Sequence, residues 1–330
     1  MDDIARLAGL STSTVSRALQ DDPRIRPATR EKVAALARKH GYAVNSNARK
    51  LRLSRSNTIA VVIHLPPSAG PEWSGPFIFK LLTDVANGLW LRRQDLLLVP
   101  PESERPLAYQ SLLASKGADG IIFLGQGADD QWLIDLARTD VPFVVWGAVQ
   151  SDAHYCTVGS DNLKGGALVA ERFVELGRRR ILFVGNRQHL EMGQRWEGLK
   201  AELEANAGEF TLDYVEVADF TFETAFSAVQ RHLSARRKKE LPDAIFAASD
   251  EIALAILATA AEVGIKIPEQ MSVVGYDDLP TASHVHPALT TVRQDTRQAG
   301  ALLVEKLFQM IDGGRPSSVM IPTTLVIRQT

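Results

Sequence analysis

Four residues near the start of the chain have side chains suited to reading the edges of DNA bases. Thr12, Ser13, Ser16 and Arg17 recur at the spacing of one helical face. An arginine guanidinium can donate two hydrogen bonds to a guanine, and short hydroxyl side chains let a helix come close to the bases. The pattern predicts a helix that enters the major groove with its N-terminal turns.

Two further side chains carry a different chemistry. Arg195 and Asp277 are expected at strand-to-helix edges, where α/β proteins place their ligands. The guanidinium can donate a pair of hydrogen bonds to vicinal hydroxyls, and the carboxylate can accept two. The aromatic faces of Phe77 and Trp146 can stack on the apolar face of a sugar ring, although each could equally belong to the core.

Three short helices are expected to position the first group. Asp2–Ala8 and Thr12 to about Gln20 flank a turn that contains Gly9, and Ser11 is a suitable N-cap for the second helix. A third helix is expected from Pro27 to His40. The apolar residues at helical spacing are Ile4, Leu7, Ala8, Val15, Leu19, Val33, Leu36 and Ala37. The spacing is typical of a helix-turn-helix, and a plain helical hairpin is the alternative.

Charge is distributed unevenly along the chain. Residues 1–56 hold 12 Lys and Arg against 5 Asp and Glu, while the whole chain of 330 residues has a net charge of −2. A basic head on an acidic body is expected when one end meets phosphate. The alternative is a solvated basic surface. Arg49, Lys50, Arg52 and Arg55 follow the third helix with few large apolar neighbours, which predicts a linker that orders on a partner.

The remaining sequence alternates short apolar runs with amphipathic helices. The runs are β-branched and apolar on both faces, as in parallel strands covered by helices. We therefore predict an α/β core of doubly wound parallel sheets, in two lobes. The expected strands are 58–63, 96–99, 120–124, 143–146, 156–159, 180–184, 214–217, 244–247 and 272–275. The main helices are expected at 77–94, 163–176, 195–205, 222–233 and 251–263.

Several protein classes are disfavoured. The single cysteine, Cys156, rules out an internal disulfide, and His284 and His286 lack the partners of a metal site. No phosphate-binding loop follows the first strand and no catalytic set is present, so we expect neither an enzyme nor a cofactor. The start of the chain does not resemble a signal peptide, and no apolar run approaches a membrane span, so a cytoplasmic protein without membrane contact is expected.

The motifs together resemble the lactose-repressor (LacI/GalR) family. The resemblance covers the whole chain. In the head it rests on residues 3–11, 14–19 and 29–33, on Gly41-Tyr42, and on the Asn45, Ala48, Arg49, Leu51 and Arg52 pattern. In the core it rests on residues 118–122, 161–166, 177–181, 195–198, 243–250, 272–278, 287–292 and 325–328.

The resemblance implies roles for the head. Thr12, Ser13 and Arg17 would occupy base-reading positions of the recognition helix. A hinge helix containing Asn45, Ala48 and Leu51 would fold on operator DNA, with Leu51 as an apolar wedge in the minor groove. Two positions depart from the family pattern. Val44 stands where proline usually precedes the hinge, and Arg26 stands where a capping residue usually precedes the third helix.

The resemblance also implies a core similar to periplasmic sugar-binding proteins, with a ligand between two lobes. Arg195 and Asp277 would be the main effector ligands, and Phe220 matches an aromatic position beside the ligand. Ser249 stands in place of a frequent asparagine. Taken alone, Asp161 and Ser249 are expected to cap helices, and Gly165-Gly166 is expected to allow close helix packing.

The expected protein is a homodimeric transcriptional regulator, most often a repressor in this family, acting on an approximately palindromic operator. Its domains would be residues 1–43, a hinge at 44–57 and a core at 58–330. Within the core, lobe 1 would span about 58–155, lobe 2 about 156–287, and residues 288–330 would cross between them. The effector would be a sugar or glycoside. A purine or nucleoside effector, a solute-binding protein of a transporter and a Rossmann enzyme are the alternatives.

Overall fold

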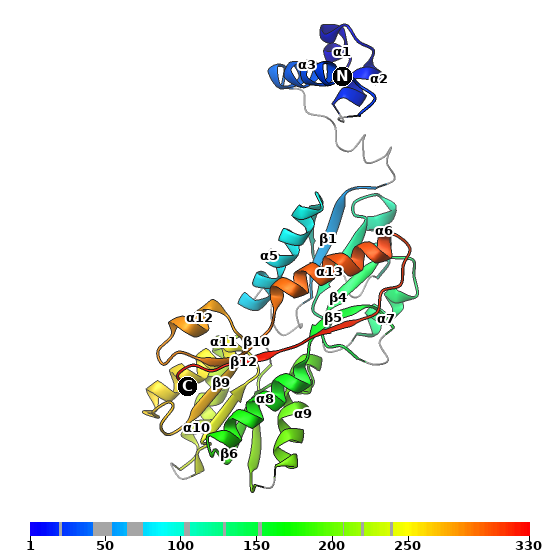
Figure 1. The fold of residues 1–330 in the computed structure, drawn as a ribbon. Helices are drawn as coiled ribbons and strands as arrows, with labels where there is room; N and C mark the ends of the chain where they lie inside the picture. The colour runs from blue at the N-terminus through cyan, green and yellow to red at the C-terminus, as the bar shows by residue number, and fades with distance from the viewer. Residues whose placement is uncertain are drawn as a thin grey trace. The chain divides into compact units, whose positions relative to one another are not determined.

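The computed structural model divides the chain into two compact units, Met1–Ser56 and Asn57–Thr330. It describes residues 1–19, 22–41, 55–64, 75–101, 106–127, 130–150, 154–206, 208–218, 221–237 and 240–330. No helix in these ranges is both long and apolar enough to cross a membrane. Figure 1 labels the helices and several of the strands.

The first unit contains three helices, α1 (Asp2–Ala8), α2 (Thr12–Ala18) and α3 (Pro27–Lys39). Gly9 ends α1 with a φ of 68°, a backbone conformation that favours glycine. The Ser11 side chain then accepts a hydrogen bond from the Thr14 amide and caps α2. The predicted turn and cap are thus present between the first two helices.

One small core holds the three helices together. Its buried residues are Ile4, Ala5, Ala8, Val15, Ala18 and Val33, with Leu10, Leu19, Ile25 and Leu36 packed against them. The expectation that Leu7 belongs to the apolar face of α1 is wrong, since 49% of this residue is exposed. The buried face of α1 is formed by Ile4, Ala5 and Ala8, and Leu7 lies outside this face.

The first lobe of the second unit contains a parallel six-stranded sheet of order β11-β5-β4-β3-β1-β2. Its strands are β1 (Thr58–Ile63), β2 (Asp95–Val99), β3 (Gly120–Leu124), β4 (Phe143–Trp146), β5 (Thr157–Ser160) and β11 (Val319–Ile321). Its helices are α5 (Pro76–Leu91), α6 (Pro106–Ala114), α7 (Gln131–Ala137) and α13 (Thr296–Ile311). Helices α5 and α13 pack side by side over one face of the sheet (Figure 1).

The second lobe contains a sheet of order β12-β10-β9-β8-β6-β7, parallel except for β12. Its strands are β6 (Arg180–Gly185), β7 (Thr211–Glu216), β8 (Ala244–Ala247), β9 (Ser272–Asp277), β10 (Thr290–Arg293) and β12 (Thr324–Val326). Its helices are α8 (Asn162–Glu175), α9 (Leu190–Ala205), α10 (Phe222–Ser234), α11 (Asp250–Glu262) and α12 (Pro280–His284). The two sheets confirm the predicted doubly wound architecture.

The chain passes between the lobes three times. The connections are Asp161 between β5 and α8, residues 294–295 between β10 and α13, and residues 322–323 between β11 and β12. The Asp161 amide donates to the Ile321 carbonyl at 2.8 Å, which ties the first passage to the third. The second lobe therefore begins at α8 and not near residue 156, because β5 pairs with β4 in the first sheet.

Burial explains why the central strands could be recognised. Strands β1, β3, β4, β8 and β9 are buried along their whole length, whereas the edge strands β2 and β7 are mostly exposed. Asp161 and Ser249 cap α8 and α11 by accepting from the Lys164 and Ile252 amides, as predicted.

Gly166 sets the distance between α8 and α9. A Cβ at this position would lie 2.1 Å from the Arg195 carbonyl oxygen and 2.7 Å from the Leu199 nitrogen. Both are backbone atoms of α9, so neither can turn aside. We expect Gly166→Ala to destabilise the chain by roughly 2–3 kcal/mol, as overpacking does. Urea unfolding of the full chain measures this. Leu163→Ala, on the exposed side of α8, is the control and should change stability by about 0.5 kcal/mol or less.

Candidate functional site

One cavity in the second unit brings together five of the six residues predicted to bind an effector. Phe77 and Trp146 come from the first lobe, and Arg195, Ser249 and Asp277 from the second. Phe220 lies outside the described residues. The other lining residues are His64, Gly75, Pro76, Ile78, Gly125, His189, Glu191, Glu251, Leu279 and Gln294. The cavity therefore lies between the two lobes.

Arg195 is held rigidly in the second turn of α9. Its Nε donates to Asn162 Oδ1 at 2.8 Å, and its Nη1 donates to the Ala248 carbonyl. The guanidinium carbon lies 3.7 Å from the centre of the Tyr276 ring, a cation–π contact. These contacts fix the guanidinium in a side chain that lines the cavity. The interior helical position corrects the expectation that a helix begins at Arg195, since α9 starts at Leu190.

Asp277 ends β9 in a strained and buried position. The backbone angle φ is 121° at Asp277 and 53° at Asp278, values that residues other than glycine rarely adopt. Gln294 donates to Asp277 Oδ1 at 2.6 Å, and burial raises the pKa of Asp277 to about 7. Such strain is typical of functional sites. The Asp277 carboxyl group lies beside the passage that contains Gln294.

A second buried carboxylate, that of Asp250, lies near Asp277. Asp250 accepts from the Leu279 amide at 2.7 Å and from Thr291 Oγ1 at 2.6 Å. Burial, and then the nearby Asp277, raise the pKa of Asp250 well above its usual range. Asp278 differs, because Arg328 and Arg293 bind its carboxylate and lower its pKa despite partial burial. Burial therefore favours the protonated form of Asp250 and Asp277, whereas the two arginines favour the ionised form of Asp278.

The wall from the first lobe is apolar and aromatic. The rings of Phe77 and Trp146 have centroids 5.9 Å apart at an interplanar angle of 42°. Pro76 and Ile78 extend this wall. The wall from the second lobe carries hydrogen-bonding groups: His189, Glu191, Arg195, Ser249, Glu251 and Asp277. A flat ring with an apolar face and polar edges suits such a cavity.

The sequence reasoning missed His64, His189, Glu191, Glu251 and Gln294. Glu191 and Arg195 stand four residues apart on α9 and so share one face of the helix. This spacing would have revealed Glu191 had the helix been assigned its full length. His64 and Gln294 carry no local signal, because their place in the cavity depends on how the two lobes come together.

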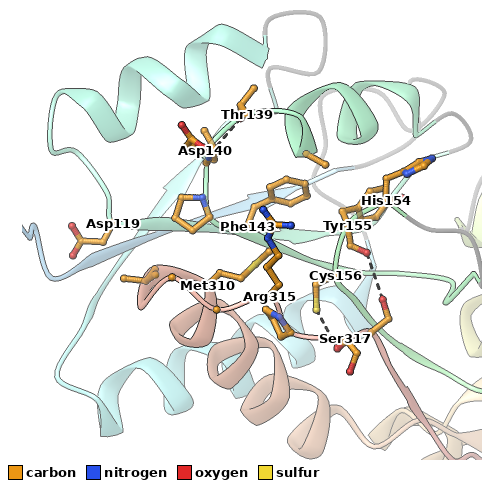
Figure 2. Close-up of a pocket in the computed structure, with 18 residues that line it drawn as sticks. Asp119, Thr139, Asp140, Phe143, His154, Tyr155, Cys156, Met310, Arg315 and Ser317 are labelled. Carbon is orange, nitrogen blue, oxygen red and sulfur yellow. Dashed lines mark hydrogen bonds between the residues drawn. The ribbon is translucent and has the colours of Figure 1, made fainter.

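A second and wider cavity, of about 680 Å³, lies at the other end of the first sheet (Figure 2). It is lined by the residues before β3, β4 and β5 and by the segment after α13. Cys156 Sγ contacts the Ser317 carbonyl at 3.5 Å, and burial raises the pKa of this thiol to about 11. Asp119 accepts from the Asn57 amide at 2.7 Å. None of the residues predicted to bind DNA or effector lines this cavity.

The first unit presents the predicted base-reading residues on α2. Thr12, Ser13 and Arg17 are exposed, and Ser16 is half-buried. Asn45, Ala48 and Leu51 lie outside the described residues. Arg26 precedes α3 without capping it through its side chain. The exposed hydroxyls and guanidinium lie on a helix fixed by a buried core, as base readout requires.

Comparison with known proteins decides the family. A sequence profile described as "Bacterial regulatory proteins, lacI family" matches residues 1–45, and one described as "Periplasmic binding protein-like domain" matches residues 170–330. The HTH-type transcriptional regulator CelR of Thermobifida fusca is 31% identical over 336 residues, which cover 99% of this chain and 96% of CelR. The chain belongs to the lacI family of bacterial regulatory proteins. It is a DNA-binding transcriptional regulator and not an enzyme.

Other relatives of this lacI-family regulator match along its whole length. Catabolite control protein A of Priestia megaterium is 25% identical over 99% of this chain and 98% of the relative. A structure of the Lac repressor dimer bound to operator and the anti-inducer ONPF superposes with a TM-score of 0.85 at 26% identity, covering 99% and 97% of the two chains. A CelR–cellobiose complex superposes with a TM-score of 0.70 at 29% identity, covering 99% and 98%.

Proposed function

We propose that this regulator is a repressor whose operator affinity is controlled by a sugar or glycoside bound between the two core lobes. The observation that carries the proposal is the cavity that joins Phe77 and Trp146 of one lobe to Arg195 and Asp277 of the other. Aromatic faces opposite fixed hydrogen-bonding groups are the complement of a pyranose ring. The similarity to the CelR–cellobiose complex supports a carbohydrate effector. The site of action would be the cytoplasm, where the operator DNA lies.

A purine or nucleoside effector is the second candidate. Several relatives are named PurR, among them a repressor of Photobacterium profundum that is 27% identical over 94% of this chain. A base would also stack against Phe77 and Trp146. The two candidates make different demands on the second lobe, because a sugar presents hydroxyls on every edge of its ring.

Effector binding would be coupled to the arrangement of the lobes. The cavity has about 90 Å³ of free space between its lining residues. Ligand pockets typically hold roughly 300–1,000 Å³. Binding therefore requires the walls to separate or their side chains to move, and the three passages near Asp161, Gln294 and Thr323 would transmit that movement. An effector that favours one arrangement of the lobes changes operator affinity if operator binding favours the other. By linkage, operator DNA must then change effector affinity by the same factor.

We propose that two copies act together on an approximately palindromic operator. Apolar side chains are exposed on α5 and on the edge strand β2: Phe79, Trp90, Leu91, Leu97 and Leu98. Exposed apolar patches of this kind mark interfaces in soluble proteins. The Lac repressor, similar in structure, is a dimer bound to operator. Residues 44–57 would be the hinge between the two units, with Asn45, Ala48 and Leu51 as further DNA contacts.

The proposal is tested by selecting bound sequences from a random duplex pool, with and without sugars and purine nucleosides. A recovered palindrome whose yield changes with a sugar supports the whole proposal. A palindrome that responds only to a purine or nucleoside replaces the sugar with the second candidate. A palindrome that responds to neither contradicts effector control by these compounds. Recovery of a non-repeated site contradicts the dimer.

Arg17 is the side chain on which base reading is expected to depend most. We expect Arg17→Ala to weaken operator binding by about 1–3 kcal/mol and to relax base preference at one position in each half-site. Arg38→Ala, in the last turn of α3, is a basic control that removes the same charge away from α2. Fluorescence anisotropy with operator and point-substituted duplexes measures both effects. Unchanged base preference in Arg17→Ala would assign base reading to other residues.

A further inference from the structure

The wall that the second lobe contributes to the cavity is rich in carboxylates. Glu191, Glu251 and Asp277 line it, and Arg195 is the only arginine or lysine among the described lining residues. His64 and His189 are the other titratable groups of the lining. Burial raises the pKa of Glu251 and of Asp277, so the repulsion of negative charge depends most on Glu191. Carboxyl oxygens accept hydrogen bonds, so this wall favours a ligand rich in donors.

Glu191 is the most deeply placed of the acids that the sequence did not reveal. Only 9% of the residue is exposed, although it lines the cavity. It lies in the first turn of α9, where the positive end of the helix stabilises a carboxylate. Its Oε2 lies 2.9 Å from Nδ1 of His189, so the two side chains are paired. The carboxylate is thus held by His189 and also lines the cavity, where it can accept hydrogen bonds from a ligand.

The surroundings of Glu191 keep it charged. Burial alone would raise its pKa, but the neighbouring His189 and Arg195 outweigh burial and lower it. Arg195 stands four residues later on the same helix face. Both side chains line the same cavity, so a ligand that contacts Arg195 there lies near the Glu191 carboxylate. The adjacent donor and acceptor fit the vicinal hydroxyls of a sugar.

We propose that Glu191, positioned by His189, is an effector contact that determines specificity. Through it the cavity accepts an uncharged, hydroxyl-rich ring and rejects anionic sugars such as sugar phosphates and uronates. The inference rests on the proposed sugar-responsive function and narrows it to neutral glycosides. A phosphate or carboxylate placed close to Glu191 would be opposed by repulsion between like charges. Arg195 does not offset this repulsion fully, because it is the only arginine or lysine among the described lining residues and shares the cavity with three acids.

The test measures binding of neutral sugars and their anionic counterparts to the full chain by calorimetry. The pairs are methyl β-glucoside with methyl β-glucuronide, methyl β-galactoside with methyl β-galacturonide, and cellobiose with cellobiose 6′-phosphate. We expect at least one neutral member to bind and its anionic counterpart to bind at least about 100-fold more weakly. An anionic member that binds as well as its neutral counterpart overturns the inference without a variant.

Glu191→Gln keeps the shape of the side chain and removes its charge. We expect it to weaken binding of the neutral sugar about tenfold, since hydrogen bonds to charged groups are the stronger ones. The neutral-to-anionic affinity ratio should fall at least tenfold, which mere loss of packing would not cause. Glu204→Gln, at the exposed end of the same helix, is the matched control and should leave both values unchanged.

The outcomes separate this inference from the function on which it rests. If wild type binds a neutral sugar and Glu191→Gln changes neither affinity nor ratio, the role of Glu191 is wrong and the sugar-responsive function stands. If wild type binds no sugar of the panel but binds a purine nucleoside, the sugar-responsive function fails and this inference fails with it. Operator affinity without effector, measured for each variant, verifies that the variant is folded.

Discussion

Arg195→Ala is expected to abolish the response to effector while operator affinity in the absence of effector stays within about twofold of wild type. The guanidinium makes hydrogen bonds to Asn162 and Ala248 and stacks on Tyr276, so its orientation in the cavity is fixed. Hydrogen bonds to a charged group contribute about 1.5–3 kcal/mol each. Loss of a pair of such bonds to the effector should weaken its binding at least about 100-fold. Operator titrations with increasing effector measure the response.

The control for this substitution is another arginine stacked on aromatic rings in the second lobe. Arg187 lies over the rings of Tyr214 and Trp196, at 3.4 and 5.0 Å from their centres, and does not line the cavity. Arg187→Ala should therefore retain the effector response. If Arg195→Ala loses operator binding as well as effector binding, the defect is one of folding. If it still responds to effector at wild-type concentrations, Arg195 is not an effector ligand.

The architecture could be predicted from the sequence because its signals are local. Strands buried along their whole length, such as β3 and β9, are continuous apolar runs, and the caps at Asp161 and Ser249 mark where helices begin. Asp277 and Trp146 could be assigned to a common cavity because both stand at the carboxyl end of a parallel strand, where α/β folds gather their ligands.

The missed residues lacked such signals. Gly193 interrupts the helical pattern in the first turn of α9, yet a Cβ there would lie 2.7 Å from the Arg187 carbonyl oxygen. Tight packing thus requires a glycine at this position. The same glycine hides the start of the helix in the sequence, and therefore the place of Glu191 on it. The exposed Leu7 shows the opposite error, in which apolar spacing predicts burial that the three-helix core does not supply. Gln294 belongs to a passage between lobes, whose place depends on both sheets at once.

Asp277→Asn is expected to stabilise the effector-free chain at pH 8 while it impairs the effector response. Burial raises the pKa of Asp277 from 3.8 to about 7, so the folded state prefers the protonated acid. The folded chain then binds more protons than the unfolded chain between these values, and stability falls as pH rises from about 4 to about 7. Asparagine has the same shape and cannot ionise, so the variant escapes this loss. At pH 8 the gain should be about 1–3 kcal/mol, because the neighbouring Asp250 shares part of the effect.

Thermal unfolding of both proteins at pH 5 and pH 8, without effector, tests the argument. The advantage of Asp277→Asn should be smaller at pH 5, where only part of the stability has been lost, and should reach its full value by pH 8. Asp135→Asn, at an exposed carboxylate in α7, is the control and should show no such pH-dependent gain. Melting curves that change equally with pH in wild type and Asp277→Asn would show that the buried charge has no cost. The expected result, a more stable chain that no longer responds, would mean that stability is lost at Asp277 in order to keep an ionised acceptor for the effector.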